Sequence, residues 1–473
     1  MCTVHIVDSG HTRALLTVVT LCFGGLSASL TQTLVIPIQG ELPELLHTTP
    51  ANAGWVVTIT LLAAAVTMPI SGKLGDLFGK PVVLMSSAGM LAAGSVVCAL
   101  SSTLAPMLVG RAMQGLAMGF IPVAIALIRE VVPPDMANTG IAAMSATLGV
   151  GGAIGLPLAA WVVQTYDFHA LFWMAAGFAV VLLVGLVTLV PRPRDARGGR
   201  VDLVGAVGLA IGLVGVLLGV SKGREWGWLD GRTIGSVVVG LVVLLVWGAF
   251  ELGQDEPLVD LRATARRPVL LTNIAAVAIG FGMMAQAIVV PQLLQLPTST
   301  GYGLGQTILE AGLWMAPGGL MMLVFAPVSS RMMTNVGPKL TLMTGAGVLG
   351  VGYLVAFLLM DAPWQLLVAS IVISSGVGIG YAAMPALIMG STEPSEAGSA
   401  LGVNALMRSV GTTTAAAVMA TILAGSGGRG GYELCFAIGA AAAFVGVAIT
   451  ALVPHVHQRA VRADATESAT ASA

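Results

Sequence analysis

The sequence is poor in charge. Asp, Glu, Lys and Arg make up only 9% of its 473 residues, and the formal net charge is −1. Soluble domains carry about 25% charged residues, so this shortage excludes an ordinary globular protein. The chain also lacks a basic patch for nucleic acid and a glycine-rich loop ending in Gly-Lys-Ser/Thr for ATP. We therefore expect neither nucleic-acid binding nor direct use of ATP.

Side chains that could carry catalysis or hold a metal are equally scarce. The four cysteines have no spacing typical of a metal or redox site, and we interpret them as packing residues: Cys2, Cys22, Cys98 and Cys435. A lone His455-x-His457 pair is too weak a pattern for a metal site. No His/Asp/Glu cluster or Ser/His pair lies in or near an apolar run. These absences predict a protein that is not an enzyme and has no cofactor or metal.

Long apolar runs are what the sequence does have. Residues of hydrophobic type make up 56% of the chain. A bilayer core needs about 20 apolar residues per helical span, and runs without strict alternation exclude a barrel. We predict an all-α polytopic membrane protein with fourteen transmembrane helices, near residues 14–36, 51–71, 82–100, 105–127, 140–163, 169–191, 203–221, 234–251, 268–293, 308–331, 339–360, 364–391, 398–424 and 432–453.

The basic residues predict how these spans are oriented. An even number of spans places both termini on one side, and the side richer in Lys and Arg is cytoplasmic. With cytoplasmic termini, the inner segments hold fifteen basic residues: Arg13, Lys73, Lys80, Arg129, Arg192, Arg194, Arg197, Arg200, Arg262, Arg266, Arg267, Arg331, Lys339, Arg459 and Arg462. The outer loops hold four: Lys222, Arg224, Arg232 and Arg429. We therefore predict a multi-pass protein of the cytoplasmic membrane with both termini inside.

Two polar stretches divide the chain. We interpret Pro191–Asp202 and Glu251–Arg267 as solvated linkers because the first is rich in Arg and the second carries charges of both signs. They separate a six-helix bundle at 1–191, a linker with two inserted transmembrane helices at 192–267, and a second six-helix bundle at 268–453. Residues 454–473 are rich in Ala, Ser and Thr and are expected to be a disordered tail.

A polar hairpin between the second and third spans reads Gly-Lys-Leu-Gly-Asp-Leu-Phe-Gly-Lys over residues 72–80. Gly72, Gly75 and Gly79 permit a tight turn and close approach of helices. A degenerate copy lies at residues 326–339, the equivalent place of the second half, and such repetition is typical of transporters built from two repeats. For Asp76 we predict a gating contact with the N-terminal amides of a helix or with a nearby basic residue.

At this point the residues resemble the major facilitator superfamily, in its fourteen-span drug:proton antiporter branch, over about residues 12–453. The hairpin at 72–80 is similar to the signature of loop 2–3. Leu-Val-Gly-Arg-Ala-Met-Gln-Gly at 108–115, with Arg111 and Gln114, resembles the signature of the fourth helix. Gly-Gly-Ala-Ile-Gly-Leu-Pro at 151–157 is similar to the antiporter motif of the fifth helix. The resemblance implies the major facilitator fold, two six-helix bundles plus two inserted helices, and multidrug or antibiotic export coupled to proton influx.

Two positions depart from that branch. Its first helix usually carries an Asp before a Thr, whereas this chain has Thr31 ahead of Gln32 and Thr33. The carboxylate implied in proton handling is thus absent. The basic residue usual after the hairpin Asp is here Leu77, so a local charge relay would have to use Lys80 or Arg129.

Two arginines lie deep in predicted spans, Arg111 about 9 Å and Arg408 about 15 Å along their helices. Such residues face a wet cavity or a partner, because an arginine at the bilayer centre costs about 2.5–3.5 kcal/mol. Each is either a cation lining a cavity or a hydrogen-bond centre bracing neighbouring helices. No carboxylate is predicted near the midplane, so the deep charge is positive. A cavity of this kind favours anionic or neutral substrates over organic cations.

Further polar residues are candidates for the substrate and proton pathway: Gln32, Thr33, Gln114, Gln292, Gln295 and Asn404. Each of them could equally be a hydrogen bond between helices. Gly151 and Gly155 predict close helix packing, and Pro157 predicts a kink in the fifth span. In a carrier that alternates its access, this packing would seal one bundle against the other; plain tight packing is the alternative.

The leading hypothesis is a monomeric exporter of small amphipathic compounds, in the lipid bilayer, that uses protons as the coupling ion. Proton-coupled uptake of an organic anion on the same fold is the alternative, because the same arginines would serve it. A membrane receptor without transport activity is a remote third, since no sizeable domain lies outside the spans.

Overall fold

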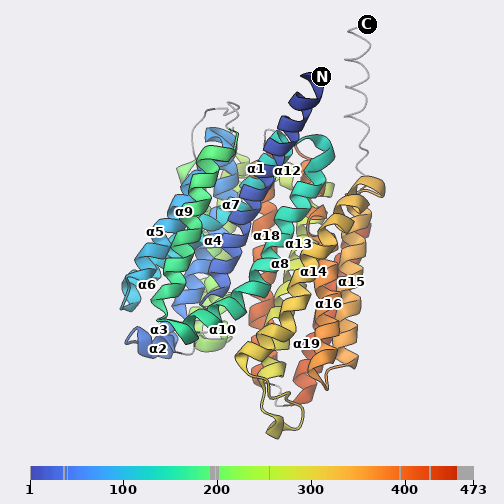
Figure 1. Ribbon diagram of the computed structural model, residues 1–473. Helices are drawn as coiled ribbons and strands as arrows, with labels where there is room; N and C mark the ends of the chain where they lie inside the picture. Colours follow the sequence, from blue (N-terminus) through green and yellow to red (C-terminus); the bar gives the residue numbers. More distant parts are fainter. Residues whose placement is uncertain are drawn as a thin grey trace.

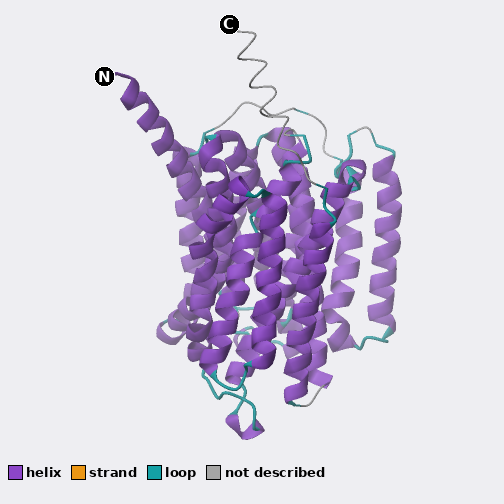
Figure 2. Cartoon of the chain, turned by 90° about the vertical axis from the view of Figure 1, so that its right-hand side faces the viewer, coloured by secondary structure: helices purple, strands orange, loops and turns teal. Residues whose placement is uncertain are grey.

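The computed structural model describes residues 2–35, 38–39, 41–191, 198, 202–254, 256–393, 396–425 and 428–454. Within these residues the chain forms helices and loops and no strand (Figure 2). The tail predicted to be disordered and most of the first linker lie outside the described residues.

Thirteen helical stretches are long and apolar enough to cross a membrane, and α8 makes a fourteenth as a bent pair. The prediction of an all-α, fourteen-span membrane protein is therefore confirmed. The first nine helices are α1 (Cys2–Thr33), α2 (Leu42–Leu45), α3 (Pro50–Ala53), α4 (Trp55–Phe78), α5 (Lys80–Ala99), α6 (Leu104–Leu116), α7 (Phe120–Val131), α8 (Pro134–Thr165) and α9 (His169–Leu189), with the 3₁₀ turn η1 (Ala117–Gly119) joining α6 to α7. The others are α10 (Leu203–Trp226), α11 (Gly231–Leu252), α12 (Leu261–Thr264), α13 (Arg267–Gln295), α14 (Ile308–Asn335), α15 (Pro338–Leu358), α16 (Pro363–Gly380), α17 (Ala383–Met389), α18 (Ala397–Gly425) and α19 (Arg429–Ala451), with η2 at Thr298–Thr300. Two of the thirteen stretches are composite: Leu104–Val131 contains α6, η1 and α7, and Pro363–Met389 contains α16 and α17.

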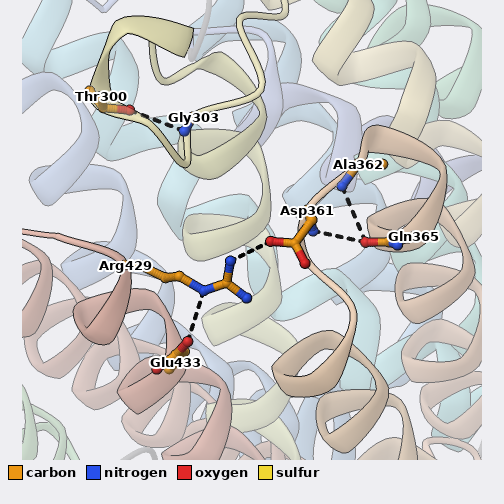
Figure 3. A network of polar contacts seen from close by, with 7 residues as sticks. All are labelled: Thr300, Gly303, Asp361, Ala362, Gln365, Arg429 and Glu433. Atoms are coloured by element: carbon orange, nitrogen blue, oxygen red, sulfur yellow. Dashed lines mark hydrogen bonds and ion pairs between the residues drawn. The ribbon is translucent and has the colours of Figure 1, made fainter.

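The helices stand side by side, and α1 begins at the same end of the molecule at which α19 ends (Figure 1). We call this end the terminal face and the opposite end the distal face. At the distal face, Arg429 at the start of α19 forms ion pairs with Asp361, before α16, and with Glu433 (Figure 3). These exposed pairs join parts of the second bundle and contribute little to stability.

The two bundles meet through a reciprocal pair of contacts. Helix α4, the second span of the first bundle, packs on α18, the fifth span of the second bundle. Helix α14, the second span of the second bundle, packs on α8, the fifth span of the first. The hairpins also repeat, because Gly79 before α5 has φ 96° and Gly337 before α15 has φ 87°, a conformation that favours glycine. This exchange of second and fifth spans is the arrangement expected of two related repeats.

The inserted helices α10 and α11 pack on each other, and α10 also packs on α4 and α18 where the bundles meet. The interpretation of Glu251–Arg267 as a solvated linker is wrong at Glu251, Leu258 and Val259, whereas residues 252–254 and 256 are exposed. Glu251 is 2% exposed, Leu258 is fully buried and Val259 is 4% exposed. Leu258 and Val259 belong to an apolar cluster with side chains of α4, α10 and α18, so these two residues anchor the segment between those helices.

Candidate functional site

A cavity of about 560 Å³ lies toward the distal face between α4, α10, α13 and α18. Its polar lining comes from Gln39, Thr58, Ser221, Lys222, Arg224, Glu225, Thr412 and Thr413, and its apolar lining includes Leu61, Met284 and Ala416. The Nζ atom of Lys222 lies 2.7 Å from Glu225 Oε2 and 5.0 Å from the ring centroid of Trp55. With two cations and one anion in the lining, the cavity carries excess positive charge.

Small and sulfur-containing side chains fill the space between this cavity and the terminal face. Ala64 and Met68 of α4, Met118 of η1 and Ala405 of α18 are buried in one cluster with Ala28 of α1. Gln32 reaches the cluster by donating from Nε2 to Met118 Sδ at 3.2 Å. We call this cluster the cavity floor. Because it joins helices of both bundles, the bundles must separate for a solute to pass it.

Beyond the floor, α4 and α18 touch backbone to backbone. A Cβ on Gly72 would lie 2.1 Å from the carbonyl oxygen of Gly398, and one on Gly402 would lie 2.4 Å from that of Met68. Asp76 then caps α18, since its Oδ1 accepts from the backbone N–H of Gly398 at 3.2 Å and its Oδ2 from that of Ser399 at 2.9 Å. A carboxylate is favoured at a helix N-terminus by the helix dipole and the unpaired amides.

Of the two basic residues proposed from the sequence as partners of Asp76, Lys80 is the one that contacts it. Lys80 is 7% exposed; its Nζ lies 3.6 Å from Asp76 Oδ1 and forms an ion pair with Glu130. Arg129 is exposed and makes no hydrogen bond or ion pair among the described residues. Glu130, which was not proposed for the site from the sequence, is thus a further partner of Lys80.

A second contact between the two bundles lies at the terminal face, between α8 and α14, and involves no charged group. Thr139 and Ser330 hydroxyls lie 2.9 Å apart, and Asn138 Nδ2 donates to Thr334 Oγ1 at 3.3 Å. Asn138 and Thr139 lie in the first turns of α8, whereas Ser330 and Thr334 lie near the end of α14. This α8–α14 contact occupies the position equivalent to the α4–α18 contact but contains no carboxylate.

Arg111 is a hydrogen-bond centre and does not line the cavity. It is 1% exposed and donates from Nε to the carbonyl of Val56 and from Nη1 to the carbonyl of Thr31 and to Gln114 Oε1. Gln114 in turn donates to Ser95 Oγ at 2.9 Å. In this conformation Arg111 and Gln114 therefore fit the alternative, a hydrogen-bond centre between helices, and not the lining of the cavity. Thr31, where the resemblance implied an Asp, contacts Arg111 through its backbone carbonyl, which a residue of any type would supply.

Arg408 also lies outside the cavity lining. It is 8% exposed and stacks over the ring of Tyr381, with 4.6 Å between its Cζ and the ring centroid. One turn earlier on α18, Asn404 donates to Asn273 Oδ1 of α13 at 2.9 Å. Both residues therefore brace α18 within its own bundle.

The other predicted pathway residues are dispersed. Thr33 donates to the carbonyl of Leu30, and Gln292 and Gln295 lie in the last turn of α13 and are absent from the cavity lining. Gly151 and Gly155 pack on Ser29 and Thr33 of α1, inside their own bundle. The glycine of α8 that contacts the other bundle is Gly149, which packs on Met322 of α14. The bend of 43° in α8 falls beside Pro157, as a proline kink requires.

The cavity lining contains none of the eight residues predicted for the pathway. Lys222 was assigned to an outer loop because the predicted span ended at residue 221, whereas α10 continues to Trp226. A helix boundary moved by five residues thus concealed the cavity's buried cation. The sequence around Thr58, Thr412 and Thr413 does not distinguish them from the other threonines in apolar runs.

We expect Gly72→Val to hold α4 and α18 apart at the terminal face, because its side chain would overlap the carbonyl of Gly398. The reporter is Ala405→Cys in the cavity floor, where the native side chain is 3% exposed. Its labelling by a soluble maleimide should become faster in the Gly72→Val background. The matched control is Gly89→Val, since nothing lies within 4 Å of a Cβ at Gly89. Unchanged labelling in Gly72→Val would contradict the assigned close contact.

Comparison with known proteins gives the family. The model of the Major Facilitator Superfamily matches residues 21–413 and, in a second match, 274–472. The uncharacterized MFS-type transporter YvkA of Bacillus subtilis is 23% identical over 92% of this chain and 94% of its own length. The tetracenomycin C resistance and export protein of Streptomyces glaucescens is 28% identical over 70% of this chain, which spans 60% of that relative. The crystal structure of the human organic anion transporter MFSD10 superposes with a TM-score of 0.67 at 15% identity, over 92% of this chain and 99% of that one. The chain therefore belongs to the Major Facilitator Superfamily, among relatives that include antibiotic exporters.

Proposed function

We propose that this protein exports small amphipathic compounds, anionic or neutral in preference to cationic, by alternating access coupled to proton influx. The observation that carries the proposal is the cavity of about 560 Å³ on one side of a closed floor. A carrier needs such one-sided access, because a path open at both faces would dissipate the gradient that drives it.

The chemistry of the cavity supports the substrate class. Leu61, Met284 and Ala416 offer apolar contact, and Thr58, Thr412 and Thr413 offer hydroxyls to polar substituents. Methionine side chains adapt to ligands of varied shape. Lys222 and Arg224 outweigh Glu225 in charge, so an organic cation meets net repulsion at the cavity.

The orientation proposed from the sequence identifies the state of the cycle, and the direction of transport rests on the relatives. With the terminal face in the cytoplasm, as the positive-inside rule supports, the conformation described is closed inward and accessible from outside. An exporter in this state has released its substrate or is ready to accept a proton. The named function of the tetracenomycin relative supports export of a natural product.

The test uses inside-out vesicles containing the full chain and three probes of matched size: anionic, neutral and cationic. We expect uptake of the anionic or neutral probe when a proton gradient is applied, and loss of that uptake when the gradient is collapsed. Preference for the cationic probe would overturn the substrate class. Uptake that ignores the gradient would overturn proton-coupled export.

Lys222→Gln should reduce the preference for the anionic probe while leaving transport of the neutral probe in place. The reason is that the substitution removes one of two cations from the cavity lining and leaves the shape of the side chain similar. The ratio of anionic to neutral uptake measures the effect. The matched control is Lys339→Gln, whose native amine bonds to the carbonyl of Ala451 at the terminal face, far from the cavity. An unchanged ratio in Lys222→Gln would mean that this lysine has no part in selectivity.

A further inference from the structure

Two carboxyl groups meet where the inserted helices come together near the terminal face. Asp202 caps α10, and its Oδ1 accepts from the backbone N–H of Gly205 at 2.7 Å. Glu251 lies at the end of α11, is 2% exposed, and accepts through Oε2 from the backbone N–H of Val259 at 3.4 Å. In each carboxyl group, therefore, one oxygen is held by a backbone amide.

The remaining oxygens, Asp202 Oδ2 and Glu251 Oε1, are directed at the same place. Both are buried, and neither has a hydrogen-bond partner of normal geometry among the described residues. A nearby polar group is the buried indole N–H of Trp247, one turn earlier on α11, which also lacks a partner of normal geometry and interacts with Glu251. The two carboxyl oxygens lie 2.4 Å and 2.2 Å from the point at which a Cβ on Gly205 would sit, so only glycine leaves room for them. Two buried carboxylate oxygens this close repel each other, and sharing one proton removes the repulsion.

No described cation neutralises the pair. Arg262 of α12 donates from Nη2 to the carbonyl of Leu252 at 3.0 Å rather than to either carboxyl group. The other charged residues near this place line an adjoining pocket of about 360 Å³: Lys73, Asp76, Glu256, Asp260 and Glu396. Among the described residues none of these forms an ion pair with Asp202 or Glu251.

We propose that Asp202 and Glu251 form a proton-binding site, holding one proton between Oδ2 and Oε1, whose occupancy controls the docking of residues 256–260 on α18. The connection is a short series of contacts. Glu251 holds Val259, the carbonyl of the preceding Leu258 accepts from Ser399 Oγ at 3.3 Å, and the backbone N–H of Ser399 donates to Asp76. The carboxyl pair is thus linked to the contact that closes the terminal face.

The direction of the effect follows from the charges. With the proton in place, Glu251 stays beside Asp202 and continues to accept a hydrogen bond from the backbone N–H of Val259. Loss of the proton to water in the adjoining pocket leaves two adjacent negative charges, which drives Glu251 away and releases the segment. Low pH at the terminal face therefore favours closure, and high pH favours opening. A role for this site in coupling protons to export rests on the proposed function. The existence of the proton site does not.

The test is backbone hydrogen exchange of the full chain in lipid nanodiscs across a series of pH values, without substrate or gradient. Exchange is corrected for its intrinsic pH dependence, and the peptides covering 256–264 and 396–403 are compared. In the native protein we expect their protection to fall as pH rises. Glu251→Gln should abolish this fall, because a neutral amide can accept from Val259 at every pH. Asp202→Asn, which keeps a good helix cap, should do the same.

The matched control is Glu256→Gln, which neutralises a carboxylate of the adjoining pocket and should keep the native pH profile. A native profile in both Glu251→Gln and Asp202→Asn would overturn the proposal. So would protection that rises with sodium at fixed pH, since that would identify a cation site. Because the assay contains no substrate, failed export with an intact pH profile would overturn only the proposed function.

Discussion

Asp76→Asn should reduce gradient-driven export by about tenfold or more while leaving substrate binding largely intact. The native carboxylate accepts two backbone amides of α18 and pairs with Lys80, all buried at the terminal face. Hydrogen bonds to a charged group are worth about 1.5–3 kcal/mol and neutral ones about 0.5–1.5 kcal/mol. Losing about 2 kcal/mol from one conformation shifts its equilibrium about thirtyfold, at 1.36 kcal/mol per tenfold. The cavity lies beyond the floor, so its contacts with substrate are unchanged.

The measurement pairs initial export rates in vesicles with equilibrium binding of the transported probe. The matched control is Lys73→Gln, in the same hairpin. The native Lys73 lines the pocket of about 360 Å³ near the terminal face and makes no ion pair among the described residues. Export by Asp76→Asn at the native rate, in correctly inserted protein, would show that the contact with α18 does not limit the cycle.

Arg111→Lys should destabilise the protein and stop export, although it conserves the charge. One guanidinium reaches the carbonyls of Val56 and Thr31 and the amide oxygen of Gln114, so it joins α1, α4 and α6. An ammonium is a compact charge and cannot span these three acceptors in the fork geometry of arginine. At about 0.6 kcal/mol for an average hydrogen bond between membrane helices, the loss is about 1–2 kcal/mol. An unpaired charge in the apolar interior adds to that loss.

Thermal unfolding in detergent and export in vesicles both report on this variant. Arg429→Lys is the matched control, because the same change at the exposed ion pairs of the distal face should be tolerated (Figure 3). If Arg111→Lys folds and transports normally, Arg111 acts through its charge alone, and its assignment as a brace between helices is incorrect.

The fold was predictable because its signals are local to each span. Apolar runs of sufficient length specify helices in lipid, and the repeated hairpins at 72–80 and 326–339 indicate two related halves. The antiporter motif also predicted the bend at Pro157. Its glycines, however, pack on α1 of the same bundle, because sequence shows that a helix approaches closely without showing which neighbour it approaches.

The candidate site was predicted less well, for reasons that particular residues make clear. The partners of Arg111 are largely backbone carbonyls, and a carbonyl is present at every position whatever the side chain. Glu251 resembles a linker residue in a stretch of mixed charge, yet the fold buries it between two inserted helices. The contacts predicted for Asp76, with helix N-terminal amides or with a basic residue, are both present, because its position at the end of a bundle leaves few other partners. Its gating role stays a prediction.

The most direct test of the account is to measure access to both sides of the cavity floor in one protein. Ala405→Cys reports on the buried floor, and Ala420→Cys reports on the distal cavity. Labelling of each is followed by soluble maleimide in proteoliposomes, with and without substrate and a proton gradient. Alternating access predicts that any condition that speeds labelling of one position slows labelling of the other. Simultaneous acceleration at both positions would contradict the account, because it would mean a path open through the whole membrane.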